Sequence, residues 1–65
     1  MNNRYEIQLE VTDNSLEPFM FARTKEEALY KARYLARTTV LTDVVRVHVY
    51  NLKTEMCVGT FAVGN

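Results

Sequence analysis

The sequence predicts an α+β domain: a four-stranded antiparallel sheet with one amphipathic helix on one face, in the order β-β-α-β-β. Apolar and polar residues alternate over residues 4–11 and again over 44–50, which is the period of half-buried strands. Between residues 24 and 38, apolar residues recur at helical spacing instead. With 65 residues, the chain is expected to form one domain, 1–65, with a single core layer between helix and sheet.

The first two strands are predicted to form a hairpin. One face of the first strand carries Tyr5, Ile7, Leu9 and Val11. A polar turn follows at residues 12–15. The second strand covers residues 17–23, with Phe19 and Phe21 on one face. Because Pro18 cannot donate a backbone hydrogen bond, this strand is expected at an edge of the sheet.

The helix is predicted to begin after Thr24 and to run to about Thr38. Thr24 and Glu27 have the spacing of a capping box, in which each side chain accepts from the other residue's free backbone N–H. The face turned to the sheet is a stripe of small and branched residues, Ala28, Leu29, Ala32, Leu35 and Ala36.

The last two strands are predicted at residues 44–50 and 56–63, with Val45, Val47 and Val49 facing the core. A five-residue connection would pair Val49 with Cys57, Val47 with Gly59 and Val45 with Phe61. A four-residue connection would place Met56, Val58 and Thr60 opposite the valines instead. Since a one-residue slip exchanges the two faces of a strand, we favour the first register, which buries Cys57 and Phe61. In this register, Gly59 is expected to leave room beneath the helix.

Charge and cysteine content restrict the class of protein. Eight basic residues balance eight acidic ones, whereas a non-specific nucleic-acid binder usually carries excess positive charge. A single cysteine, Cys57, cannot form an internal disulfide, so a reducing, cytoplasmic location is expected. No apolar run approaches the roughly 20 residues of a membrane span, and no membrane association is expected.

The sequence holds no recognisable catalytic set. His48 is the only histidine, and we expect it at the surface, on the sheet face opposite Cys57. A metal site usually needs three or four ligands, and a phosphate loop needs more glycines than the two present. We therefore expect a protein that is not an enzyme, with no catalytic residue, no metal and no cofactor.

Two surfaces are left unexplained by packing. The outer helix face carries Tyr30, Arg33, Tyr34 and Arg37, residue types enriched in binding hot spots; the alternative interpretation is an ordinary solvated helix face. The open face of the sheet is predicted to be rather apolar and to carry Met20, Ala22, Val44, Arg46, His48, Tyr50, Met56 and Val58. Partner-binding candidates are therefore Tyr30, Arg33, Tyr34 and Arg37 on the helix, and Arg46, His48 and Tyr50 on the sheet.

The entry into the helix, residues 19–29, together with residues 44–47, resembles very small bacteriophage proteins that block host machinery. One such group inhibits host RNA polymerase, and another comprises anti-CRISPR proteins built as a small sheet with one helix. The resemblance implies an inhibitor that binds a larger host complex. The polymerase inhibitors have an acidic helix face, whereas Arg33 and Arg37 make this one basic, so no functional residue is carried over.

These observations predict a small binding or inhibitor protein that docks on a larger host protein or nucleoprotein complex through the outer helix face. Two alternatives stay open. The basic helix residues with Arg46 could bind nucleic acid. The open sheet face, or an edge strand, could join two copies in a homodimer.

Overall fold

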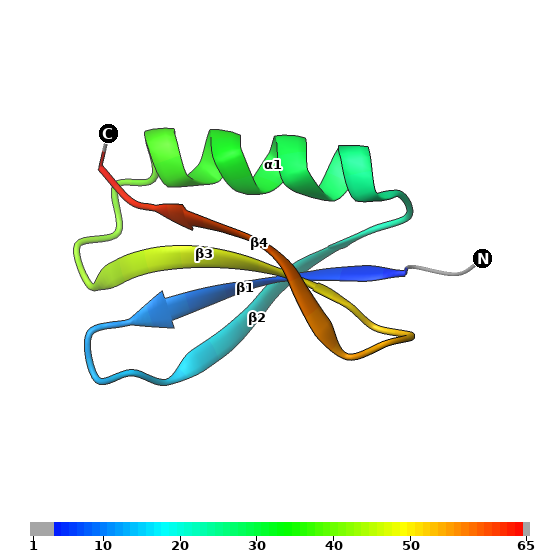
Figure 1. Cartoon of the computed structure of the whole chain (residues 1–65). Helices are drawn as coiled ribbons and strands as arrows, with labels where there is room; N and C mark the ends of the chain where they lie inside the picture. Colours follow the sequence, from blue (N-terminus) through cyan, green and yellow to red (C-terminus); the bar gives the residue numbers. More distant parts are fainter. Residues whose placement is uncertain (1–3, 65) are drawn as a thin grey trace.

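Four strands and one helix follow one another along the chain in the computed structural model, which describes residues 4–64 (Figure 1). The elements are β1 (Tyr5–Val11), β2 (Leu16–Ala22), α1 (Lys25–Thr38), β3 (Val44–Asn51) and β4 (Met56–Ala62). The predicted α+β class and the order β-β-α-β-β are confirmed.

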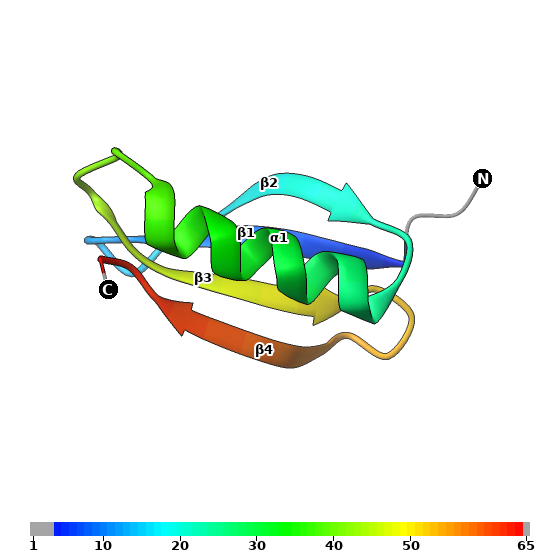
Figure 2. The same cartoon turned by 90° about the horizontal axis from the view of Figure 1, so that it is seen from above.

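The strands form one antiparallel sheet in the order β2-β1-β3-β4. The helix α1 lies across one face, and β4 and β2 form the two edges (Figure 2). The predicted hairpin of β1 and β2 and the edge position of the Pro18 strand are therefore correct. At the tip of this hairpin, the Asp13 carboxylate accepts hydrogen bonds from the backbone N–H and hydroxyl of Ser15, at 3.0 and 2.6 Å.

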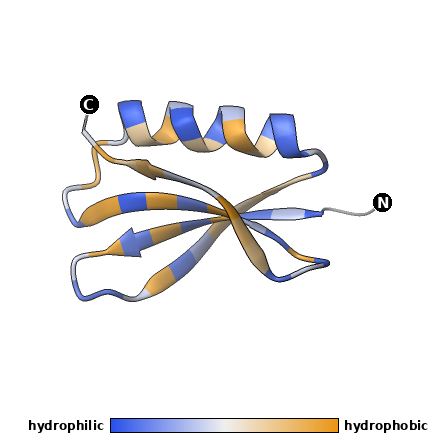
Figure 3. Cartoon of the chain, in the orientation of Figure 1, coloured by the Kyte–Doolittle hydropathy of each residue, from blue (hydrophilic) through white to orange (hydrophobic). Residues whose placement is uncertain are grey.

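The core lies between α1 and the two central strands. Ala28, Ala32 and Ala36 are the buried residues of α1, and their small side chains let the helix approach the sheet closely. Beneath the helix lie Ile7, Leu9, Val47 and Val49. Hydrophobic and hydrophilic residues alternate along the strands and around the helix (Figure 3), as half-buried elements require.

The helix begins as its sequence predicts, with one difference. The Thr24 hydroxyl accepts from the backbone N–H of Glu27 at 3.1 Å. The Glu27 carboxylate, however, accepts from the backbone N–H of Arg23 at 3.3 Å, one residue before the expected donor. The capping threonine is confirmed, and the reciprocal half of the predicted capping box is shifted by one residue.

A bulge in β2 overturns the predicted faces of this strand. Ile7 pairs with Met20 and Gln8 with Pro18, so Phe19 has no partner of its own. After this shift, Met20 packs against the core and Ala22 is buried. Phe19 and Phe21 are each 47% exposed. The prediction that put Met20 and Ala22 on the open face is wrong, because alternation cannot reveal an unpaired residue.

The last hairpin differs from the prediction in its register. Val49 pairs with Gly59 and Val47 with Phe61, two residues away from the pairing we favoured. A register shift of two residues leaves each side chain on the same face of the sheet, so Phe61 still packs against the core.

Two bulges account for the remaining misplaced residues. A second irregularity, between β3 and β4 at Val58, leaves Cys57 exposed and turns Val58 to the core. A third, between Glu10 and Val11 of β1, pairs Val11 with Val44, and Val44 is buried. The predicted burial of Cys57 and the open-face positions of Val44 and Val58 are wrong.

Within residues 4–64, α1 is the single helix, and it is neither long nor apolar enough to cross a bilayer.

Candidate binding surfaces

The outer helix surface, defined here as Tyr30, Arg33, Tyr34 and Arg37, lies on the side of α1 away from the sheet. All four residues are exposed, and the two tyrosines are 70% and 61% exposed. They lie at helical spacing opposite the buried alanines, as the sequence predicts. Their packing contributes little to the core, so their presence is not explained by stability.

The positive charges of this surface, on Arg33 and Arg37, form no ion pair within residues 4–64. The ion pairs within residues 4–64 are Lys31–Glu27, Arg46–Glu10 and His48–Glu10, and neither Arg33 nor Arg37 belongs to one. Beside them, Lys31 is 2.9 Å from Glu27. The hydrogen bond from Lys31, and then the backbone N–H of Arg23, lower the pKa of the Glu27 carboxyl.

An apolar groove runs between α1 and β2. Its volume is about 260 Å³, and its lining is mostly aromatic and aliphatic: Phe19, Met20, Tyr30, Lys31, Tyr34, Leu35 and Thr38. Two residues of the outer helix surface, Tyr30 and Tyr34, therefore form one wall of this groove. The bulge in β2 brings Phe19 to the other wall.

The opposite flank of α1, facing β4, has a different chemistry. One groove of about 370 Å³ is lined by Glu26, Leu29, Tyr30, Arg33 and Phe61. A second groove of similar size is lined by Arg33, Ala36, Arg37, Thr60, Phe61 and Ala62. Phe61 and Arg33 border both grooves, so the two grooves are neighbours between α1 and β4.

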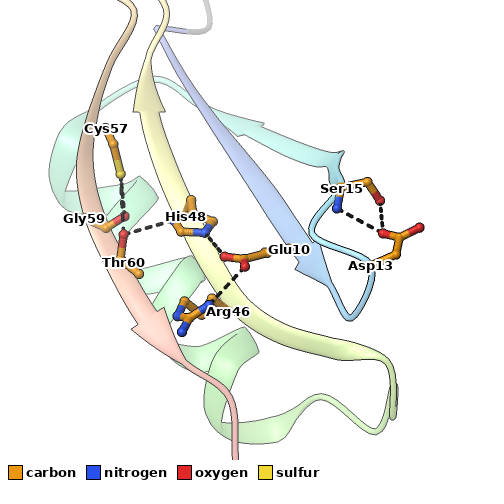
Figure 4. A network of polar contacts seen from close by, with 8 residues as sticks. All are labelled: Glu10, Asp13, Ser15, Arg46, His48, Cys57, Gly59 and Thr60. Atoms are coloured by element: carbon orange, nitrogen blue, oxygen red, sulfur yellow. Dashed lines mark hydrogen bonds and ion pairs between the residues drawn. The ribbon is translucent and has the colours of Figure 1, made fainter.

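The open face of the sheet carries a row of polar groups that crosses three strands (Figure 4). Glu10 of β1 accepts from His48 Nε2 at 2.7 Å and from Arg46 Nη1 at 3.0 Å, both on β3. His48 Nδ1 lies 3.0 Å from the hydroxyl of Thr60 on β4. The thiol of Cys57 is 3.5 Å from the same hydroxyl and 3.4 Å from the Gly59 carbonyl.

The hydrogen bonds of the row act on the ionisation of Glu10 and on the tautomer of His48. The hydrogen bond from His48, followed by the hydrogen bond and charge of Arg46, lowers the pKa of the Glu10 carboxyl despite its partial desolvation. An ionised carboxylate only accepts, so His48 Nε2 carries the proton. In the neutral imidazole, Nδ1 then accepts from the Thr60 hydroxyl. Each group along the row thus satisfies the next.

The open face is polar along β1 and β3, contrary to the prediction, whereas its β2 edge carries the exposed apolar side chains Phe21 and Leu16. Arg46, His48 and Tyr50 do lie on this face, paired with Glu10, Gln8 and Glu6. The Tyr50 ring is 6.1 Å from that of His48. Desolvation, and then electrostatic interactions with Cys57 and Glu10, raise the pKa of Tyr50. Four of the apolar residues predicted for this face, Met20, Ala22, Val44 and Val58, are turned to the core by the bulges; Met56 is exposed.

Thr60, His48 and Glu10 follow the order hydroxyl, imidazole, carboxylate, which is that of a nucleophilic triad. Such a triad also needs exclusion of water and donors for a developing oxyanion. Among residues 4–64, neither helix nor loop covers this face, and the hydroxyl belongs to an exposed threonine. We therefore interpret the row as a set of side-chain hydrogen bonds that connect β1, β3 and β4. In the same part of the chain, no three His, Cys, Asp or Glu residues are grouped to hold a metal ion.

The candidate residues predicted from the sequence fall into two separate groups. Tyr30, Arg33, Tyr34 and Arg37 share the helix, while Arg46, His48 and Tyr50 lie on the other side of the sheet. Sequence reasoning missed Phe19 in the groove and Thr60 in the polar row. Cross-strand position could have paired Glu10 with Arg46, whereas the bulge that places Phe19 has no sequence signal.

No protein-family model, curated protein or solved structure matches this chain. Its function must therefore be inferred from the chemistry of its own surfaces.

Proposed function

We propose that this chain is a non-enzymatic binding protein that docks on a larger protein through the outer helix surface and the apolar groove beside it. The observation that carries the proposal is the exposure of Tyr30 and Tyr34, at 70% and 61%, along one wall of that groove. Exposed aromatic side chains beside a groove are typical of binding hot spots.

The charge of the same surface indicates the chemistry of the partner. Arg33 and Arg37 have no ion-pair partner within residues 4–64. A matching protein surface would place carboxylates against these two guanidinium groups. It would insert an apolar side chain between Phe19 and Tyr34. Opposite charges at the rim and apolar contact at the centre are the usual anatomy of such interfaces.

The resemblance to phage-encoded inhibitors extends this proposal. On that ground we infer that the partner is a host protein or nucleoprotein complex whose work is blocked by docking. The support for inhibition is the resemblance of residues 19–29 and 44–47 alone, while the support for docking is the exposed surface.

A capture experiment with matched variants tests the docking proposal. Tagged wild-type protein and the double variant Tyr30→Ala, Arg37→Ala are incubated with bacterial lysate. The control is Phe21→Ala, Arg4→Ala, which removes one exposed aromatic and one exposed arginine elsewhere. A partner retained by wild type and control but lost from the helix variant supports the proposal. If the helix variant folds and retains every partner, the outer helix surface is not the site.

Nucleic-acid binding is the second candidate, favoured by Arg33 and Arg37 lining one groove between α1 and β4. Arg46, which we had added to this basic set, is 3.0 Å from Glu10 on the opposite side of the sheet and does not extend the basic surface. Binding through phosphates would weaken steeply as salt rises. A gel shift with single- and double-stranded DNA and RNA at low salt tests this candidate, and the absence of any shift excludes it.

A further inference from the structure

The two edges of the sheet differ in how well they are protected against pairing with another strand. An edge strand presents unpaired N–H and C=O groups, and proteins usually block it with charge, proline or a bulge. In β2, Pro18 and the bulge at Phe19 provide such protection. The strand β4, Met56–Ala62, contains neither a charged residue nor a proline. Its bulge, at Val58, lies near its start, and residues 59–62 lie free at the other edge (Figure 2).

The hydrogen-bond pattern identifies which groups of β4 are available. The Val63 N–H donates to the Val45 carbonyl at 3.1 Å, in the same register as Val47–Phe61 and Val49–Gly59. Because backbone groups alternate in direction along an antiparallel strand, these odd-numbered residues of β4 face β3. The N–H and C=O groups of Thr60 and Ala62 therefore point outward from the sheet.

We propose that β4 is the interface between two copies of this chain, paired antiparallel about a two-fold axis at Thr60. In this register, each Thr60 N–H donates to the Thr60 carbonyl of the second copy, and the two sheets join into one. Such an interface is self-complementary, as two-fold symmetry demands.

Side chains on the helix-facing side favour a second copy as the occupant. Pairing about Thr60 puts Phe61 of each copy opposite Gly59 of the other. An aromatic side chain opposite a strand glycine is a stabilising cross-strand pair. Phe61 of the second copy would enter the groove that Leu29, Tyr30 and Phe61 already line. Since β4 carries no charge, two copies of it meet without repulsion.

Charge along α1 agrees with this arrangement. Gly59 lies beneath Leu29, and the Gly64 N–H donates to the Ala36 carbonyl at 3.2 Å, so α1 and β4 run in the same direction. A two-fold axis on β4 therefore makes the two helices antiparallel. Glu26 of one copy then faces the flank that carries Arg33 of the other. The two opposite charges border one groove in each copy.

This interface shares Tyr30 and Arg33 with the outer helix surface but leaves the apolar groove between α1 and β2 free. The groove between α1 and β2, with Phe19 and Tyr34, lies on the opposite flank of the helix. A dimer through β4 would therefore present two such grooves, and either proposal can fail without the other.

Sedimentation of the whole chain over a range of concentrations tests the dimer. Wild type is expected to shift from monomer to dimer as concentration rises. Ala62→Pro removes one outward N–H and leaves the bonds to β3 in place, so this variant is expected to stay monomeric. The control Leu16→Pro makes the same change at the β2 edge and should dimerise like wild type.

Amide hydrogen exchange on wild type provides a second measurement, which does not depend on the folding of a variant. In the dimer, the amides of Thr60 and Ala62 should exchange about tenfold more slowly than in the monomer, while that of Leu16 is unchanged. A wild-type chain that is monomeric at every concentration overturns the proposal. So does a dimer in which the Thr60 and Ala62 amides keep the exchange rates of the monomer, since its interface then lies elsewhere.

Discussion

Glu10 of β1 accepts hydrogen bonds from two side chains of β3 on the open face. It accepts from His48 at 2.7 Å and from Arg46 at 3.0 Å, and its pKa lies below the ordinary value of 4.5. A carboxyl with a lowered pKa in the folded state stabilises the fold above its unfolded pKa. That contribution is lost as the pH falls from about 4.5 through the folded pKa.

The variant Glu10→Gln should therefore show a weaker loss of stability on acidification below pH 4.5. The amide cannot titrate, so the free energy of unfolding of the variant changes less with pH. Urea unfolding at a series of pH values measures the two slopes. Glu17→Gln, a change at an exposed glutamate of β2, is the control and should keep the wild-type slope. Equal slopes for wild type and Glu10→Gln would show that the polar row adds no pH-dependent stability.

At the scale of single residues, the sequence predicts the face on which a residue lies better than it predicts the residues that it contacts. It places His48 on the open face correctly, because period 2 in β3 holds across residues 46–50. It cannot place Thr60 and Cys57 beside His48, since that depends on a bulge at Val58. The polar row is therefore a product of strand register, which alternation does not specify.

The contact between α1 and β4 depends on a residue without a side chain. A Cβ atom at Gly59 would lie 2.5 Å from Leu29 Cδ2 and 3.7 Å from the Phe61 ring. The first distance is shorter than a van der Waals contact, so a side chain here would displace Leu29. The sequence predicts this role in outline, because we expected Gly59 to leave room beneath the helix.

Gly59→Ala should consequently destabilise the protein by about 1 kcal/mol, the lower range for overpacking a filled site. The cost should fall in a Leu29→Ala background, because the displaced atom is then absent. A double-mutant cycle by urea unfolding measures the difference. An equal cost in both backgrounds would mean that Leu29 does not set the requirement for glycine.

The buried face of an element can be predicted where its hydrophobic pattern is regular. Where a bulge interrupts the pattern, the buried face cannot be predicted. The helix is regular, so Thr24 and the alanine stripe suffice to predict its start and its buried side. In β2, Phe19 and Phe21 are the most hydrophobic candidates for the core, yet the smaller Ala22 is buried and Met20 packs beside it. The bulge at Phe19 exchanges these faces, and in doing so it supplies one wall of the candidate groove.

In the molecule as a whole, the residues that stabilise the fold are different from those that we assign to binding. The core is one thin layer of alanines and branched residues between α1 and the central strands. The exposed aromatic side chains lie instead on the outer helix surface and along β2: Tyr30, Tyr34, Phe19 and Phe21. A chain of this size has little stability to spare, so aromatic residues outside its core indicate selection for something other than folding.

Alanine substitution of the two tyrosines tests this separation directly. Tyr30→Ala and Tyr34→Ala should each change the free energy of unfolding by no more than about 0.5 kcal/mol, as expected of exposed sites. Val47→Ala, at a fully buried position, should cost about 2 kcal/mol because it opens a cavity in the core layer between α1 and the sheet. Urea unfolding of the three variants gives the comparison. If Tyr34→Ala costs as much as Val47→Ala, the tyrosine is structural, and the outer helix surface loses the observation on which its binding role rests.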